Sequence, residues 1–138
     1  MQSFEPLEQL IEDIEILPDP QERLAALVQW GRKAEELPIA EQTEAKSIKG
    51  CQSRVWLDCH HNGSLCEFRV AADSAMVRGL VGVTVRLAHG QNSEQLATAD
   101  LDWAKRLKLD RMITPTRLNG LAAVASAVRV LARTNPTH

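Results

Sequence analysis

Apolar positions recur with a helical period at both ends of the chain and with a strand period in the middle. A first helix is indicated by apolar residues spaced three or four apart: Leu7, Leu10, Ile11 and Ile14. The segment Asp19-Pro20-Gln21-Glu22 predicts the start of a second helix. It supplies an N-cap aspartate, a proline at the first helical position and a capping-box glutamate. We expect this helix to end before Pro38 and a loop to follow over residues 38–50.

Two stretches in the middle of the chain alternate between apolar and polar residues, as half-buried strands do. Asn62-Gly63 lies between them and is the strongest short signal for a hairpin turn. With these two residues as the turn, His61 pairs with Ser64 and Cys59 pairs with Cys66. One face of the hairpin then collects the apolar side chains, which are Val55, Leu57, Cys59, Cys66, Phe68 and Val70.

The valine-rich stretch over residues 75–89 fits either a helix or a buried strand. Its length, the preceding Asp73-Ser74 and the following Gly90 favour a helix, which is apolar on nearly every side and so belongs in the centre of the core. Gly79 and Gly82 weaken a helix and indicate close backbone packing. Further helices are predicted after Ser93, over residues 100–108, and from Thr114-Pro115 to about Ala132.

Length and composition fit one domain over residues 1–138, with a disordered tail at about residues 134–138. The longest apolar stretch, residues 80–88, contains Thr84 and Arg86 and is too short to cross a membrane. The first residues lack the basic start and apolar stretch of a signal peptide, so we expect a cytoplasmic protein. Three cysteines, an odd number, do not suggest a disulfide framework.

Charge is unevenly distributed along the chain. Residues 1–44 hold 11 acidic and 3 basic side chains, whereas residues 45–138 hold 7 acidic and 13 basic ones. This is either a pair of solvated acidic helices in front of a basic body, or a positive field that helps to hold an anionic sulfur. Nucleic-acid binding is not expected, because the basic residues are scattered and there is no tyrosine or aromatic-basic stacking platform.

Cys51 is the residue whose neighbours point most clearly to chemistry. Gly50 before it allows a sharp turn, and the cations Lys46, Lys49 and Arg54 lie within a few residues. Cations favour the thiolate, which is the nucleophile in sulfur chemistry. Polar residues flank the position on both sides, so a reactive, exposed thiol is preferred to an inert buried one.

The other cysteines favour a structural interpretation. Cys59 and Cys66 lie on the apolar face of the hairpin, where buried, reduced thiols are expected rather than a disulfide. His60 and His61 are adjacent to Cys59, but alternation places His60 on the opposite face, so at most three ligands converge. Zinc motifs with paired C-x-x-C or H-x-x-x-H elements are absent, and we therefore expect no metal site.

Arg117 lies in the first turn of the last predicted helix, where the positive end of the helix dipole makes a cation mildly unfavourable. It is either a functional position or an ordinary solvated arginine. The chain has no Gly-rich phosphate loop, no Ser-His-Asp order and no G-x-S-x-G elbow, which argues against the corresponding enzyme classes.

Three segments resemble the SufE family of sulfur-acceptor proteins: residues 47–56 with Gly50-Cys51-Gln52-Ser53-Arg54-Val55-Trp56, residues 73–80, and residues 109–120 around Thr114-Pro115-Thr116-Arg117. CsdE-like paralogues, which act with a second desulfurase, share the pattern. The resemblance implies an α+β fold in which helices pack on a small antiparallel sheet, as in NifU-type scaffold proteins. It covers nearly the whole chain in the expected order.

The resemblance also implies that Cys51 accepts sulfur from a cysteine desulfurase (SufS- or CsdA-like) and passes it to a downstream iron–sulfur scaffold complex. Supporting or partner-binding positions are then Lys49, Gly50, Gln52, Arg54, Asp73 and Arg117. The chain needs no cofactor of its own, since the pyridoxal phosphate belongs to the desulfurase and the persulfide on Cys51 is transient. The resemblance implies that the chain activates the desulfurase, and we expect no independent catalysis.

Two alternatives remain open at this point. The chain is a non-covalent regulatory module with Cys51 merely at its interface, or a stand-alone cysteine hydrolase, which needs a histidine placed to serve Cys51. A further expectation concerns the loop, in which hydrophobic Ile48 lies close to flexible Gly50. We expect the loop to place the sulfur against the apolar core in the free protein and to move outward on docking.

Overall fold

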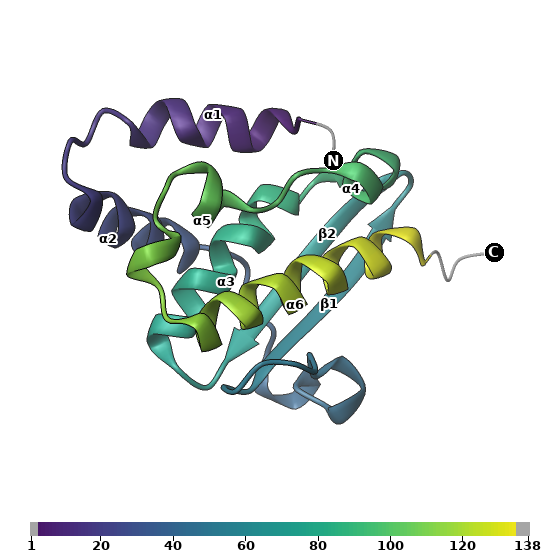
Figure 1. Cartoon of the computed structure of the whole chain (residues 1–138). Coiled ribbons are helices and arrows are strands. Elements are labelled where there is room, and N and C mark those ends of the chain that lie inside the picture. Colours follow the sequence, from purple (N-terminus) through teal and green to yellow (C-terminus); the bar gives the residue numbers. More distant parts are fainter. Residues whose placement is uncertain (1–2, 135–138) are drawn as a thin grey trace.

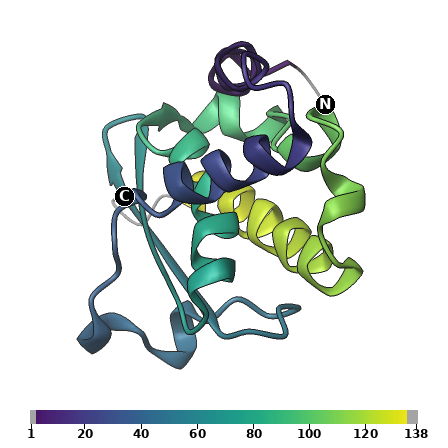
Figure 2. The same ribbon diagram turned by 90° about the vertical axis from the view of Figure 1, so that its left-hand side faces the viewer.

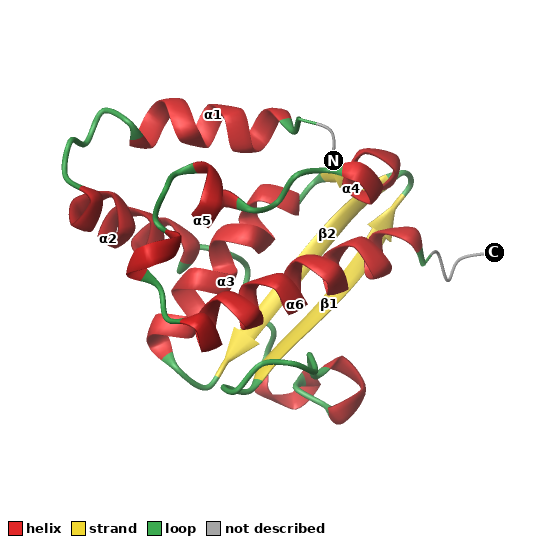
Figure 3. Cartoon of the chain, viewed as in Figure 1, coloured by secondary structure: helices red, strands yellow, loops and turns green. Residues whose placement is uncertain are grey.

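The structure is a computed structural model and describes residues 3–134, so all but the first residue of the predicted tail lies outside the described range. Figures 1 and 3 show how helices surround one small sheet. The helices are α1 (Glu5–Ile14), α2 (Pro20–Gly31), α3 (Ala75–Ala88), α4 (Ser93–Thr98), α5 (Trp103–Arg106) and α6 (Pro115–Arg133). The strands are β1 (Val55–Asn62), β2 (Leu65–Ala72) and β3 (Gln91–Asn92), and short 3₁₀ turns are η1 (Ile39–Glu41), η2 (Glu44–Lys46) and η3 (Asp110–Met112).

Three of the helices start at the predicted caps. The Asp19 carboxylate accepts a hydrogen bond from the Gln21 N–H at the start of α2. The Ser74 hydroxyl accepts from the Val77 N–H at the start of α3, and the Thr114 hydroxyl accepts from the Arg117 N–H at the start of α6. Each bond satisfies a donor that the first helical turn leaves free.

The sheet has the order β1-β2-β3 with antiparallel neighbours. The predicted hairpin register is wrong by two residues, because His61 pairs with Cys66 and Cys59 pairs with Phe68. The turn is made by Gly63 and Ser64, and Gly63 has a φ of +62°, which suits glycine at the first central position of a hairpin turn. A shift of two residues keeps every side chain on its predicted face.

Helices α3 and α6 cover one face of the hairpin, with α3 over β2 and α6 over β1 (Figure 1). Helix α2 packs on α3, as Figure 2 shows from the side. The main core lies between these layers and receives the apolar face of the hairpin. On the opposite face of the sheet, Leu37, Trp56 and Ala71 form a small separate cluster.

Helix α3 is buried along most of its length, which confirms the prediction of a central helix. Its backbone approaches α2 closely through Gly31, Gly79 and Gly82. A Cβ atom on Gly31 would lie 1.9 Å from the Gly79 carbonyl oxygen, and one on Gly82 would lie 2.0 Å from the Gly31 carbonyl oxygen. Glycine is therefore required at these positions by the space between the two helices.

Among the described residues, no helix has both the length and the apolar character that crossing a membrane requires.

Candidate functional site

Cys51 lies at the tip of a loop that is closed at its base. The Ile48 N–H donates to the Val55 carbonyl over 2.8 Å, and Ser47 forms an isolated bridge with Trp56. Gly50 has a φ of +91°, a conformation that residues with a side chain rarely adopt, and it turns the chain just before the cysteine. The predicted sharp turn at Gly50 is confirmed.

The thiol of Cys51 points to the first half of α6. Its Sγ lies 3.7 Å from the Gly120 carbonyl oxygen, to which the S–H group donates a weak hydrogen bond. The side chain is half-buried and, like that of Ile48, packs against the main core. The structure thus places the sulfur against apolar groups, as expected for the free protein.

The expectation that neighbouring cations favour the Cys51 thiolate is wrong for this conformation. Burial raises the pKa of Cys51 above its ordinary value, so the neutral thiol is favoured. The Arg54 guanidinium stacks on the ring of Trp56 at 5.1 Å, and the Lys49 ammonium pairs with Glu44. These cations interact with other groups instead of facing the sulfur.

Lys46 takes part in an ion-pair network on the outer face of the sheet. Its ammonium lies 3.5 Å from carboxylate oxygens of both Glu41 and Asp58. Arg69 bridges the same two acids at 2.7 and 2.6 Å, and its guanidinium holds the pKa of Glu41 below the usual range. The network attaches η1 and η2 to the sheet and so positions the segment that leads into the Cys51 loop.

A cavity of about 430 Å³ lies beside the thiol. It is bounded by the loop, by the first half of α3 and by the start of α6. Its lining residues are Cys51, Gln52, Ser53, Val77, Leu80, Val81, Thr114, Thr116, Arg117, Gly120 and Leu121. The side formed by α3 is apolar, whereas the loop and the start of α6 contribute amide, hydroxyl and guanidinium groups.

Known proteins resemble this chain over most of its length. The family model described as "SufE: Fe-S metabolism associated domain" matches residues 8–132. The chain belongs to the SufE family. An uncharacterized SufE-like protein of Rhizobium meliloti (strain 1021) is 27% identical over 128 residues, which cover 89% of this chain and 91% of the relative. The family description associates the domain with iron–sulfur metabolism.

A solved structure supports the fold of this SufE-family chain. The solution structure of a hypothetical protein from Thermus thermophilus superimposes with a TM-score of 0.77 at 20% sequence identity. The match covers 96% of each of the two chains. The predicted α+β fold, with helices on a small antiparallel sheet, is confirmed.

In this SufE-family chain, the structure brings together only some of the predicted site residues. Cys51, Gln52 and Arg117 line the same cavity, and Gly50 forms the turn beside it. Arg117 is exposed at the start of α6 and forms no ion pair with the described residues. Lys49, Arg54 and Asp73 are not among the residues that line the cavity.

Asp73 and Arg54 instead hold the base of the loop. The Arg54 N–H donates to the Asp73 carboxylate over 3.2 Å, and the Asp73 N–H donates to the Arg54 carbonyl over 3.1 Å. This reciprocal pair connects the residue before β1 to the residue after β2. The two bonds fix the base of the Cys51 loop to the end of the hairpin.

Sequence reasoning did not identify the cavity wall formed by Val77, Leu80 and Val81. These residues lie in the second resembling segment, residues 73–80, or next to it, and their spacing of three and four places them on one face of α3. That face was assigned to the core because it is apolar. The spacing was visible, but nothing in it distinguished a core face from a cavity wall.

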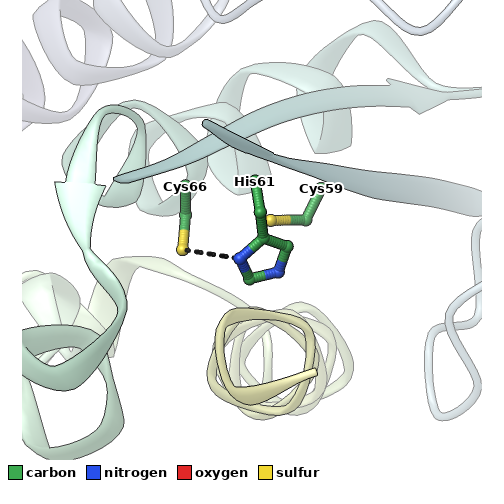
Figure 4. A group of neighbouring side chains, drawn as sticks. All are labelled: Cys59, His61 and Cys66. Carbon is green, nitrogen blue, oxygen red and sulfur yellow. Dashed lines mark hydrogen bonds between the residues drawn. The ribbon is translucent and has the colours of Figure 1, made fainter. Parts of the chain in front are cut away.

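All three cysteines of this SufE-family chain are free thiols. Cys66 is buried and Cys59 is half-buried, in agreement with the prediction of reduced thiols in the hairpin. Burial raises the pKa of Cys59 to about 12. Figure 4 shows that both thiols lie beside His61, so the three side chains that alternation allowed to converge do lie together.

Proposed function

We propose that this chain is a sulfur carrier, which takes persulfide sulfur from a cysteine desulfurase onto Cys51, stimulates that enzyme and delivers the sulfur to iron–sulfur cluster assembly. The observation that carries the proposal is the place of the Cys51 thiol, at the tip of a loop and beside a cavity of about 430 Å³. One water occupies roughly 30 Å³ in the liquid, so an additional sulfur atom fits this space. The association of the family with iron–sulfur metabolism supports the same conclusion.

Sulfur transfer to Cys51 is a thiol exchange that involves no net oxidation. The Cys51 thiolate attacks the outer sulfur of the desulfurase persulfide. A new S–S bond forms on Cys51, the S–S bond of the donor breaks, and the donor cysteine leaves as a thiolate. The proton lost from Cys51 passes to solvent or to the leaving sulfur. The product is Cys51–S–S⁻, and the pyridoxal phosphate that makes the donor persulfide belongs to the desulfurase.

The cavity provides a suitable environment for this product. The apolar side chains of Val77, Leu80 and Val81 keep water and small oxidants away from the outer sulfur, while Arg117 offers a positive charge at the opposite wall. Because Arg117 forms no ion pair with the described residues, its guanidinium is available to an anion. A persulfide anion is thereby protected and electrostatically stabilised without a metal or cofactor.

The same burial that protects the sulfur also reduces its reactivity in the free protein. A raised pKa means that a smaller fraction of Cys51 is thiolate at neutral pH than in an unfolded chain. Transfer therefore needs the loop to move outward when the desulfurase docks, which restores solvent and lowers the pKa. This is the gating step of the proposal.

Alkylation rates test the gating step. In the free protein at pH 7.5, we expect iodoacetamide to react with Cys51 about tenfold more slowly than with the same residue in the urea-unfolded chain. Because the pKa of Cys51 is raised, the alkylation rate should keep increasing at pH values above the ordinary pKa of a cysteine. Docking of the desulfurase should accelerate the reaction. Equal rates in the free protein and in the complex contradict gating.

Intact mass tests the carrier function directly. After incubation with a cysteine desulfurase and cysteine, the chain should gain the mass of one sulfur atom, and peptide mapping should place it on Cys51. Addition of a reducing thiol should remove the added mass. A chain that stimulates the desulfurase without ever gaining sulfur would instead be a non-covalent regulator.

A further inference from the structure

Cys59, His61 and Cys66 converge on the side of the hairpin that faces α6 (Figure 4). Their sulfur and nitrogen atoms all lie within 4.8 Å of one another. The strand register explains this convergence, because Cys59 and His61 are two residues apart on one face of β1 and Cys66 is the direct partner of His61 on β2. Three side chains with metal-binding atoms thus meet at one point.

The ring of His61 is oriented by a backbone group of α6. Its Nε2 atom lies 3.0 Å from the Leu131 carbonyl oxygen, and a carbonyl only accepts hydrogen bonds. Nε2 therefore carries the proton, and in the neutral ring the lone pair belongs to Nδ1, which lies 4.0 Å from the Cys66 Sγ. A metal-binding histidine commonly has this arrangement, in which one nitrogen donates to a carbonyl and the other faces the ligands.

We propose that Cys59, His61 and Cys66 form a zinc site with a fourth position for water. Two sulfur ligands and one imidazole favour Zn²⁺ over Mg²⁺ or Ca²⁺, which prefer oxygen. Tetrahedral zinc, with bonds of about 2.3 Å to sulfur and 2.0–2.1 Å to nitrogen, places such ligand atoms roughly 3.6–3.8 Å apart. The present separations, all within 4.8 Å, therefore need to contract by at most about 1 Å.

The cluster adjoins a cavity on the side of His61, which offers a route for water. That residue lines a cavity of about 500 Å³ between the hairpin turn, the start of α4 and the end of α6. Glu94 and Arg133 also line the cavity and give it one charge of each sign. Zinc replaces the protons of the two thiols, and these protons leave to solvent through the open side.

The zinc site is separate from the sulfur-carrier site. Cys51 lies beside Gly120 near the start of α6, whereas His61 binds Leu131 near its end. At a rise of 1.5 Å per residue, these two points of the helix are about 16 Å apart. The metal therefore joins β1 to β2 near the hairpin turn, beside the His61–Leu131 hydrogen bond to α6, and Cys51 remains free for sulfur transfer.

Cobalt titration of the reduced, full-length, metal-free protein tests the proposal. Co²⁺ is expected to bind one equivalent per chain and to give the thiolate-to-cobalt charge-transfer and intense visible bands of a tetrahedral site. Zn²⁺ should then displace it stoichiometrically. Absence of the charge-transfer band overturns the proposal.

Matched variants assign the ligands. Cys59→Ser and His61→Gln are each expected to weaken Zn²⁺ binding at least about 100-fold, as measured against a competing chelator. His60→Gln is the control, because His60 is adjacent but lies on the exposed side of the strand. Cys51→Ser should also retain full affinity. Equal losses in His60→Gln and His61→Gln, both folded by circular dichroism, would refute the assignment.

Discussion

Replacing Cys51 with serine is expected to abolish sulfur uptake and to return the desulfurase to its unstimulated rate. A serine hydroxyl is a poor nucleophile at neutral pH and forms no persulfide, so the loss of transfer should be at least about 1000-fold. Sulfide release from cysteine under single-turnover conditions measures this effect. The side chain contacts only the Gly120 carbonyl by hydrogen bonding, so the fold should change little.

Measuring the binding of Cys51→Ser to the desulfurase distinguishes a loss of chemistry from a misfolded variant. Cys51→Ser should still dock with the desulfurase at nearly the affinity of the unchanged chain, as measured by calorimetry. His60→Gln is the control, since it changes an exposed side chain outside both the Cys51 cavity and the zinc cluster and should transfer sulfur normally. If Cys51→Ser docks and still stimulates the enzyme, the chain is a non-covalent regulator and the carrier proposal is wrong.

The structure weakens the hydrolase alternative. A cysteine hydrolase places a histidine within hydrogen-bonding distance of its thiol. Of the described histidines, His61 bonds to Leu131 and His89 bonds to the backbone of Phe68. None of the described histidines lines the cavity beside Cys51.

Replacing Gly82 with alanine should destabilise the protein by about 3 kcal/mol or more. Helix propensity alone predicts the opposite sign, a gain of roughly 1 kcal/mol for alanine over glycine. Packing dominates here, because the new Cβ would lie 2.0 Å from the Gly31 carbonyl oxygen. Relief requires α2 and α3 to separate, which opens the core between them. The midpoint of urea denaturation measures the loss.

Gly120→Ala is the control for this prediction. Gly120 also lies within a helix, but a Cβ there would be 3.6 Å from the Cys51 Sγ, an ordinary contact distance. This variant should be unchanged or stabilised by up to about 1 kcal/mol. If Gly82→Ala behaves in the same way, α2 and α3 do not approach one another as described.

Strong local patterns made most of the fold predictable. Caps at Asp19 and Thr114 identified two helices, and residues 75–88, which are apolar on nearly every side, identified a third. Gly79 and Gly82 predicted that the backbone of this third helix packs closely on a neighbour. The hairpin register was wrong because a shift of two residues leaves the alternating pattern unchanged. Strand β3 was missed because two residues, Gln91 and Asn92, are too short to show any period.

The site was only partly predictable, for a different reason. The resemblance identified Cys51, Gln52 and Arg117, which do meet at one cavity. Counting cations near Cys51 failed, because Lys46 and Lys49 pair with Glu41 and Glu44, and because burial, which the local sequence does not show, raises the pKa of the thiol. Alternation already indicated that Cys59, His61 and Cys66 share a face, but the orientation of the His61 ring depends on Leu131, 70 residues away, and was not visible in the sequence.

The closed base of the loop sets a tether length for sulfur delivery. The hydrogen bonds at Ile48 and at Arg54 anchor the chain on both sides, and Cys51 is the third residue from each anchor. At about 3.3–3.6 Å per extended residue, the thiol travels no more than roughly 10 Å from these points. A donor enzyme must therefore bring its own persulfide nearly to the surface of this protein, and deep catalytic pockets are suitable only if the donor cysteine is carried on a long mobile arm.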